Sequence, residues 1–266
     1  MNIEKLNKIS YRIDDIQNND KILIGGTSWQ ELNLIVTVDL DNFENFFQKV
    51  ENVAQKVEQH EGMKSWINDE APYFDAKTFA HMYSFDNVLR KMYPELSINA
   101  SKRKGYYNTE GLKKLSQSFN DGVCECAEIA ILAQAYFQRQ GFETKYFLGE
   151  ILTSPEDEFG EAHSFISIKV NNEDYFYDPA NSMIDSGIYI PRISSIEATP
   201  AQKQQFENKI HASNNKRNCA FLEAKNILTK SSLYYGYGDG ACILPSFIIS
   251  KNNIQKLDLD EKSLYR

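Results

Sequence analysis

Residues 121–141 read DGVCECAEIAILAQAYFQRQG, and this stretch decides the fold of the chain. Its small and apolar residues recur at the spacing i, i+3, i+4, i+7, i+10 and i+11, which places them on one face of an α-helix. These residues are Cys126, Ile129, Ala130, Ala133, Tyr136 and Phe137. Polar and flexible residues precede the helix, and Gly141 stands where a glycine commonly ends one.

A cysteine therefore opens this helix on its inward face. The free N–H groups of a first helical turn, and the positive end of the helix dipole, favour a thiolate over a thiol. Glu125 and Glu128 place negative charge in the same turn. Its place at the N-terminus of the helix makes Cys126 the candidate nucleophile.

Three strand-like segments follow the helix, at residues 142–151, 162–170 and 174–178. Residues 171–173 have turn chemistry, so the last two segments are expected to form a hairpin. His163 begins the first strand of this hairpin, and Asp178 ends the second. Antiparallel pairing about the turn would place both side chains at the same end of the ladder.

A cysteine at a helix start, followed by His and Asp on adjacent strands, supplies the nucleophile, base and orienting carboxylate of thiol catalysis. The sequence motifs around these residues are C-x-x-I-A at 126–130, YFLG at 146–149, AHS at 162–164 and YDPAN at 177–181. In this order and spacing they resemble the transglutaminase-like branch of the papain-like cysteine enzymes, which includes bacterial transglutaminase-like and glutamine deamidase-type proteins. The resemblance covers residues 122–181.

The resemblance implies an α+β fold with a papain-like or transglutaminase-like core. In such a core the catalytic cysteine stands at the N-terminus of a helix packed on an antiparallel β-sheet, and the sheet carries the His and the Asp. It assigns the catalytic roles here to Cys126, His163 and Asp178.

Cys124 is the alternative nucleophile. The family places a glycine two residues before its cysteine, a position that Cys124 fills if Cys126 is the nucleophile, whereas residues 122–124 (GVC) themselves fit the family's G-x-C. Choosing Cys124 would put Ala127 and Glu128 where an apolar residue and an alanine belong. A slip of two residues turns a side chain by roughly 200° around a helix, so the helical period favours Cys126.

The backbone N–H of Cys126 is the expected first donor to an oxyanion. The candidates for the second donor are Asn120, Gln117 and Trp66. Asn120 fits best, because papain-like enzymes often place Gln or Asn about a turn before the cysteine. The mechanism requires no metal or cofactor, and the chain has no EF-hand-like loop. The two cysteines beyond Cys126 are too far apart to form the second knuckle of a zinc site.

We expect a thiol-dependent acyl-transfer enzyme or hydrolase that acts on amide bonds of a protein or peptide substrate. Its expected targets are protein glutamine side chains, which it would deamidate or transglutaminate. In that chemistry His163 takes the proton of Cys126, and Asp178 holds the imidazole tautomer. The alternatives are a papain-like cysteine peptidase and a catalytically silent binding module on the same fold. An arylamine acetyltransferase is a weaker alternative, because those enzymes have a different sequence motif around the cysteine.

The net charge of −8 disfavours nucleic acid and anionic membrane surfaces as partners. The N-terminal residues have no continuous apolar run, so no Sec signal is expected, and the longest apolar stretch is far too short to span a membrane. We therefore expect no membrane insertion. The expected location is the cytoplasm, or outside the cell as a bacterial effector secreted without a signal peptide.

We expect residues 1–266 to form a single catalytic domain, with residues 1–105 as an N-terminal lobe or cap and the core within residues 106–266. Hydrophobic periodicity predicts strands at 21–26 and 32–38 and helices at 43–57 and 77–93, the first of them capped by Asp41. The basic residues at 101–104 (SKRK) are expected in a solvated loop.

Overall fold

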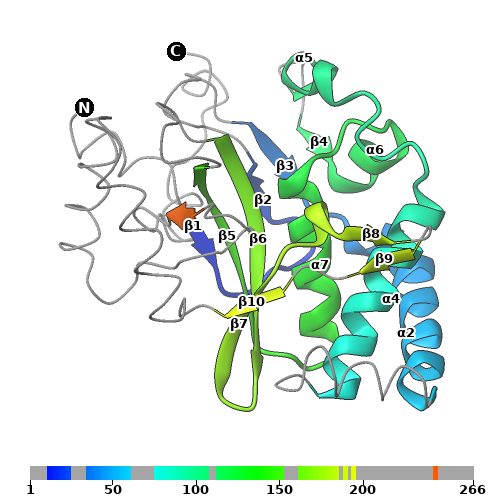
Figure 1. Cartoon of the computed structure of the whole chain (residues 1–266). Helices are drawn as coiled ribbons and strands as arrows, with labels where there is room; N and C mark the ends of the chain where they lie inside the picture. The colour runs from blue at the N-terminus through cyan, green and yellow to red at the C-terminus, as the bar shows by residue number, and fades with distance from the viewer. Residues whose placement is uncertain are drawn as a thin grey trace, which may run out of the picture.

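In the computed structural model the described residues are 11–24, 34–60, 75–107, 112–152, 161–185, 188–190, 193–195 and 242–244. They form a mixed α/β fold (Figure 1). An antiparallel sheet lies along one side of the helix that begins at Cys126, and further helices lie on the other side.

The largest sheet in the described residues has six strands, all paired antiparallel. Its strands are β1 (Tyr11–Ile13), β5 (Thr144–Leu152), β6 (Glu161–Val170), β7 (Glu173–Tyr177), β10 (Ile193–Ser195) and β11 (Cys242–Leu244). The order is β1–β5–β6–β7–β10, and β11 also pairs with β5. Strands β1 and β11 therefore share one edge of β5, β1 opposite residues 146–148 and β11 opposite residues 150–152.

Two smaller sheets accompany it. One contains β2 (Lys21–Leu23), β3 (Ile35–Thr37) and β4 (Lys113–Lys114); the other contains β8 (Met183–Asp185) and β9 (Ile188–Ile190). Strand β3 runs antiparallel to β2 and parallel to β4. The strand predicted at 21–26 is thus confirmed over its first three residues and the strand predicted at 32–38 over residues 35–37, while residues 25, 26, 32 and 33 lie outside the described residues.

The hairpin of β6 and β7 has a two-residue turn. Val170 pairs with Glu173, and the intervening Asn171 and Asn172 have φ values of 52° and 67°. Positive φ at both turn residues is the geometry that matches the twist of the flanking strands, and asparagine tolerates it better than most residues. The predicted hairpin is confirmed. Its turn fixes the register at the far end, where His163 and the residue after Tyr177 lie.

The described residues also form α-helices and three short 3₁₀ segments. They are η1 (Leu40–Phe43), α2 (Glu44–Gln59), α4 (Ala76–Met92), η2 (Ala100–Lys102), α5 (Arg103–Tyr107), α6 (Leu115–Asn120), α7 (Cys126–Arg139) and η3 (Pro179–Asn181). The helices predicted at 43–57 and 77–93 are confirmed as α2 and α4. The predicted cap was wrong, because Asp41 lies inside η1, one turn before α2 begins.

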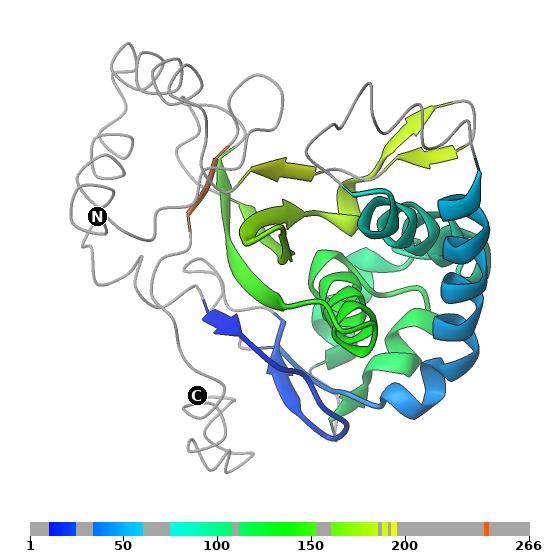
Figure 2. The same ribbon diagram turned by 90° about the horizontal axis from the view of Figure 1, so that it is seen from below.

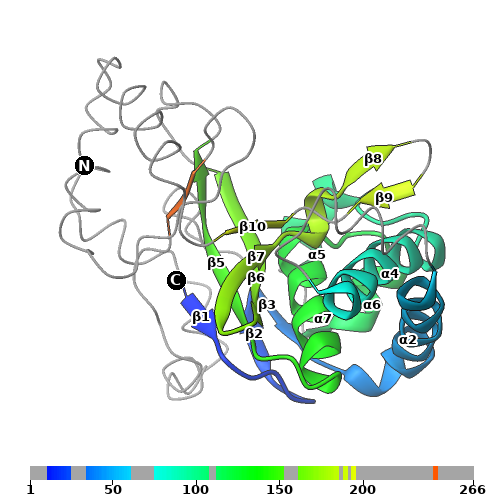
Figure 3. The same cartoon turned by 60° about the horizontal axis from the view of Figure 1, so that its bottom comes forward.

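Helix α7 lies in the middle of the molecule. It packs against β5 and β6 on one side, and the view from below shows α4 and then α2 on the other (Figure 2). The tilted view shows the same succession from the sheet to α2 (Figure 3). All residues of α7 from Ala127 to Phe137 are buried. The prediction of a single buried face was therefore too narrow, because a helix covered on both sides is buried all round.

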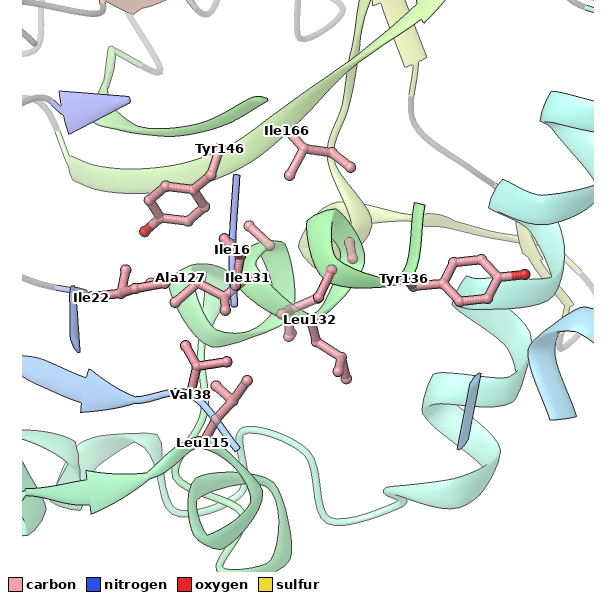
Figure 4. Close-up of a cluster of buried hydrophobic side chains, with 14 of the residues drawn as sticks. Ile16, Ile22, Val38, Leu115, Ala127, Ile131, Leu132, Tyr136, Tyr146 and Ile166 are labelled. Carbon is pink, nitrogen blue, oxygen red and sulfur yellow. The ribbon is translucent and has the colours of Figure 1, made fainter. Parts of the chain in front are cut away.

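Aromatic rings fill the space between α7 and the helices α2 and α4. The ring centroid of Tyr136 lies 5.9 Å from that of Phe47 and 5.8 Å from that of Phe85. In the close-up, Tyr136 points toward α4, while Tyr146 and Ile166 approach α7 from the sheet (Figure 4). The core is thus continuous through α7, and the position of this helix is set from two sides.

The described parts of residues 1–105 contribute to this same core. Ile13 of β1, Val38, Phe46 of α2 and Phe85 of α4 belong to one buried cluster with Ile131 of α7. Strand β1 is also a member of the sheet that carries β6 and β7. Among the described residues, no helix combines the length and the apolar character that crossing a membrane requires.

We expect the Tyr136→Ala variant to lose about 4–6 kcal/mol of unfolding free energy, from a buried cavity and a lost hydrogen bond. The Tyr136 hydroxyl lies 2.6 Å from Nδ1 of His81. Burial, with a smaller effect of Lys77, lowers the pKa of His81 to about 4, so the ring is neutral and accepts this proton. Tyr136→Phe keeps the ring and should lose only about 1–2 kcal/mol. Urea unfolding at pH 7 measures both, and equal losses would contradict the packing role.

Candidate active site

A tight turn positions the start of α7. Gly122 has φ +64°, and a Cβ at this residue would lie 2.5 Å from the carbonyl oxygen of Glu95. Only glycine fits a backbone that is both left-handed and this close to another chain segment. The neighbouring loop holds the turn, because Asn99 N–H donates to the Gly122 carbonyl at 2.8 Å and Ser97 Oγ donates to that of Cys124 at 2.7 Å. Cys126 follows as the first residue of α7.

The two cysteines of this segment have different environments. Cys124 is fully buried, and burial, assisted by the charge of Glu128, raises the pKa of its thiol to about 12. Cys126 is partly exposed, and its side chain lies close enough to His163 to raise the pKa of the imidazole. The structure thus brings His163 to Cys126, the cysteine that the helical period favours.

His163 lies between Cys126 and Asp178. Its Nε2 is 2.7 Å from Oδ2 of Asp178, and both side chains are buried. Because Nε2 is engaged by the carboxylate, Nδ1 is the ring nitrogen that is left for the thiol. The imidazole also stacks on Phe165, with ring centroids 6.2 Å apart and planes inclined by 19°. The prediction that His163 and Asp178 lie at the same end of the hairpin is confirmed.

The electrostatics favour a charged imidazole. Burial alone would lower the pKa of His163, but the Asp178 carboxylate and the Cys126 side chain outweigh it and raise this pKa to about 10. His163 is therefore protonated at neutral pH and lies as an imidazolium between Cys126 and Asp178. This is the arrangement in which a thiolate and an imidazolium stabilise each other.

Asp178 is itself held by the first turn of η3. Its Oδ1 accepts the Ala180 N–H at 3.2 Å, and its Oδ2 accepts Nδ2 of Asn181 at 3.0 Å. The Asn181 amide also lies 3.3 Å from His163 Nε2. The sequence-based prediction gives Asn181 no role, although it is the last residue of the YDPAN motif. The structure places it against both partners of the His–Asp pair.

Helix α4 secures this segment from the other side. Arg90 Nη2 donates to the carbonyl oxygens of Pro179 at 3.1 Å and Ala180 at 3.0 Å. The Tyr177 hydroxyl donates to Asp86, and burial raises the pKa of Asp86 to about 8. Asp86 is therefore largely protonated at neutral pH, and it adds little negative charge near Asp178.

The candidates for the second oxyanion donor are placed differently. Gln117 caps the start of α6, where its Oε1 accepts the Lys114 N–H at 3.1 Å. Asn120 is the exposed last residue of α6. Trp66 lies outside the described residues. The Cys126 N–H belongs to the first turn of α7, whose amides have no helical acceptor. In the described ranges, no three His, Cys, Asp or Glu side chains are grouped as a metal site would require.

A buried polar network that the sequence did not reveal adjoins Cys126. Glu128 is fully buried and receives a forked pair of hydrogen bonds from Arg103, Nε to Oε1 at 3.0 Å and Nη2 to Oε2 at 3.1 Å. It also accepts the Tyr107 hydroxyl at 2.7 Å and the Glu125 N–H at 3.0 Å. The expectation that residues 101–104 form a solvated loop was wrong, because these residues lie in η2 and α5 and the side chain of Arg103 is only 11% exposed.

A scan of the sequence against models of known protein families finds no match, and a search of curated proteins finds no significant relative.

Proposed function

We propose that this chain is a thiol-dependent enzyme of the transglutaminase-like, papain-like type that transfers the acyl group of an amide. Cys126 is the nucleophile, His163 the general base and acid, and Asp178 the residue that orients and charges the imidazole. One observation carries the proposal: the same buried imidazole is hydrogen-bonded to a buried carboxylate and interacts with a partly exposed thiol at a helix N-terminus. These are the three roles that thiol catalysis requires.

The first half-reaction forms a thioester. The thiolate of Cys126 attacks the amide carbon, and the carbonyl π electrons move to the oxygen, which accepts the Cys126 N–H. As the C–O double bond re-forms, the C–N bond breaks, and the imidazolium of His163 gives its proton to the leaving nitrogen. A primary amide thus releases ammonia and leaves an acyl group on the sulfur.

The second half-reaction removes the acyl group. Neutral His163 takes a proton from water or from an amine as that nucleophile attacks the thioester carbon, and the thiolate leaves. Water as nucleophile converts a glutamine to a glutamate, and a primary amine forms a new amide. Asp178 stabilises the imidazolium that is present before the first half-reaction and that re-forms in the second.

Protein glutamine side chains are the proposed substrates, because the YDPAN and AHS motifs resemble those of glutamine-acting enzymes. The same three residues could also cleave backbone amides, so a peptidase is the alternative within this chemistry. The two differ in product. A glutamine-acting enzyme releases ammonia and leaves the peptide chain intact, whereas a peptidase shortens it.

Limited alkylation tests the proposed nucleophile without a substrate. An ordinary thiol of pKa about 8.5 is almost unreactive toward iodoacetamide at about pH 6, whereas a thiolate held by an imidazolium reacts. We expect peptide mapping to find the label at Cys126, and we expect it to disappear in the His163→Ala variant. Slow labelling spread over all four cysteines would instead indicate a silent binding module.

The substrate is tested separately. The full chain is incubated with a mixture of denatured proteins, and ammonia release, incorporation of a fluorescent primary amine and peptide cleavage are followed together. Ammonia or amine incorporation without cleavage supports a glutamine-acting enzyme, and cleavage without either supports the peptidase.

A further inference from the structure

Two carboxylates accompany the candidate nucleophile on its own helix turn. Glu125 directly precedes Cys126, and Glu128 lies in the same turn with a fully buried side chain. Negative charge at either residue opposes the formation of a thiolate at Cys126. A site built around a thiolate therefore needs a positive charge close to these carboxylates.

Arg103 of α5 supplies that charge. Besides its fork onto Glu128, its Nη1 lies 3.7 Å from Oε2 of Glu125, and its Nη2 donates to the Ile24 carbonyl at 2.8 Å. Burial opposes the charge on Arg103, but Glu128, Cys126 and Glu125 outweigh it and raise the pKa of the guanidinium above its usual value. The guanidinium is thus within electrostatic reach of the thiol as well as of both carboxylates.

The stability of the fold does not by itself require the Arg103–Glu128 ion pair. A buried Arg–Glu pair loses much of its attraction to desolvation, and a well-packed neutral replacement is often equally stable. The local helix geometry does not call for it either. The Glu128 side chain reaches back to the N–H of the residue before the helix, a contact that glutamine makes equally well.

We propose that Arg103 is a positioning residue of the active site, which neutralises Glu125 and Glu128 so that the thiolate of Cys126 can form. Its fork onto Glu128 also fixes the first turn of α7, which presents the Cys126 N–H. This inference rests on the proposed function, because it has a consequence for catalysis only if Cys126 is the nucleophile.

The other titratable groups around Cys126 do not change charge in a way that would replace Arg103. His163 of β6 keeps its proton through the neutral range, supported by Asp178. Tyr107 of α5 is neutral, since burial raises the pKa of its hydroxyl far above the working range. Cys124 is neutral as well, since burial raises the pKa of its thiol to about 12. The variable charges at this turn are those of the buried ion pair and Glu125.

The test is the pH dependence of the iodoacetamide alkylation rate of Cys126 in the full chain, read by mass spectrometry. Glu128→Gln removes one negative charge, and the pH of half-maximal rate should fall by about one unit. Arg103→Met removes the positive charge, and this pH should rise by about one unit. The double variant Arg103→Met/Glu128→Gln keeps the wild-type sum of charges and should return to the wild-type profile.

A purely structural role gives a different pattern, in which each variant lowers the rate at every pH and the double variant is the slowest. That result overturns the proposal, as does a Glu128→Gln profile equal to wild type. Circular dichroism checks folding. If Arg103→Met does not fold, the test uses Glu128→Gln and the double variant together with Arg103→Lys. The Arg103→Lys variant keeps the positive charge and should match wild type. Wild-type protein without selective labelling of Cys126 would instead overturn the proposed function, which keeps the two failures distinct.

Discussion

The Cys126→Ala variant should release ammonia from a glutamine-containing protein no faster than the uncatalysed reaction, a loss of at least about 10⁴-fold. Alanine has no group that can form the thioester, so the oxyanion donors and the His163–Asp178 pair have no covalent step to assist. Cys126 is only partly buried, and the variant should keep its fold. A coupled ammonia assay measures the activity, and thermal unfolding shows that the loss is chemical.

Cys124→Ala is the matched control, since it removes a thiol two residues away in a different environment. Cys124 is buried in the core, so this change should cost about 1 kcal/mol of unfolding free energy. At 25 °C most of the activity should remain. The opposite pattern, with activity lost in Cys124→Ala and kept in Cys126→Ala, would make Cys124 the nucleophile. Full activity in both variants would exclude both residues as the nucleophile.

The sequence predicts those parts of the site that depend on short-range geometry. The helical period predicts Cys126 as the first inward-facing residue of the helix, and α7 does begin there, with Cys124 two residues earlier in the preceding segment. A two-residue turn at Asn171 and Asn172 fixes the register of a hairpin, and register alone brings one strand's first residues beside the other strand's end. The pairing of His163 with Asp178 follows from that register.

The sequence does not predict what depends on distant partners. Arg103 stands among basic residues, which suggests a solvated loop, and its burial results from a contact with Glu128 on another helix. The sequence also does not predict that every residue of α7 from Ala127 to Phe137 is buried. Hydrophobic periodicity reports the most apolar face, whereas the opposite face, including Gln134, is covered by elements far away in the chain.

Asn181 is an intermediate case. It belongs to the YDPAN motif, and the hydrogen bond of Asn181 to Asp178 spans only three residues. Its role could have been inferred from the conformation of the turn after Pro179, in which the Asp178 side chain accepts a backbone N–H. Arg90 could not have been inferred in this way, because its two acceptors on η3 lie about 90 residues further along the chain.

The second large effect is expected at Asp178, where two substitutions separate charge from orientation. Asp178→Ala removes the acceptor of His163 Nε2 together with its charge, so the imidazole loses both its orientation and the stabilisation of its proton. Activity at pH 7 should fall by about 10²–10⁴-fold. Asp178→Asn keeps an oxygen that can accept the Nε2 proton but removes the charge, and its activity at pH 6 should be closer to wild type.

The pH profile makes the distinction measurable. In the wild type the carboxylate of Asp178 contributes to raising the pKa of His163 to about 10, so the imidazolium that protonates the leaving amine persists in mild alkali. Without the negative charge this pKa falls, and the proton is lost at lower pH. The alkaline limb of kcat/KM should therefore move to lower pH in Asp178→Asn, while the wild type remains active at pH 8–9. An unchanged alkaline limb in Asp178→Asn would mean that Asp178 acts only by orienting the ring, and equal activity of Asp178→Ala and wild type would remove it from the mechanism.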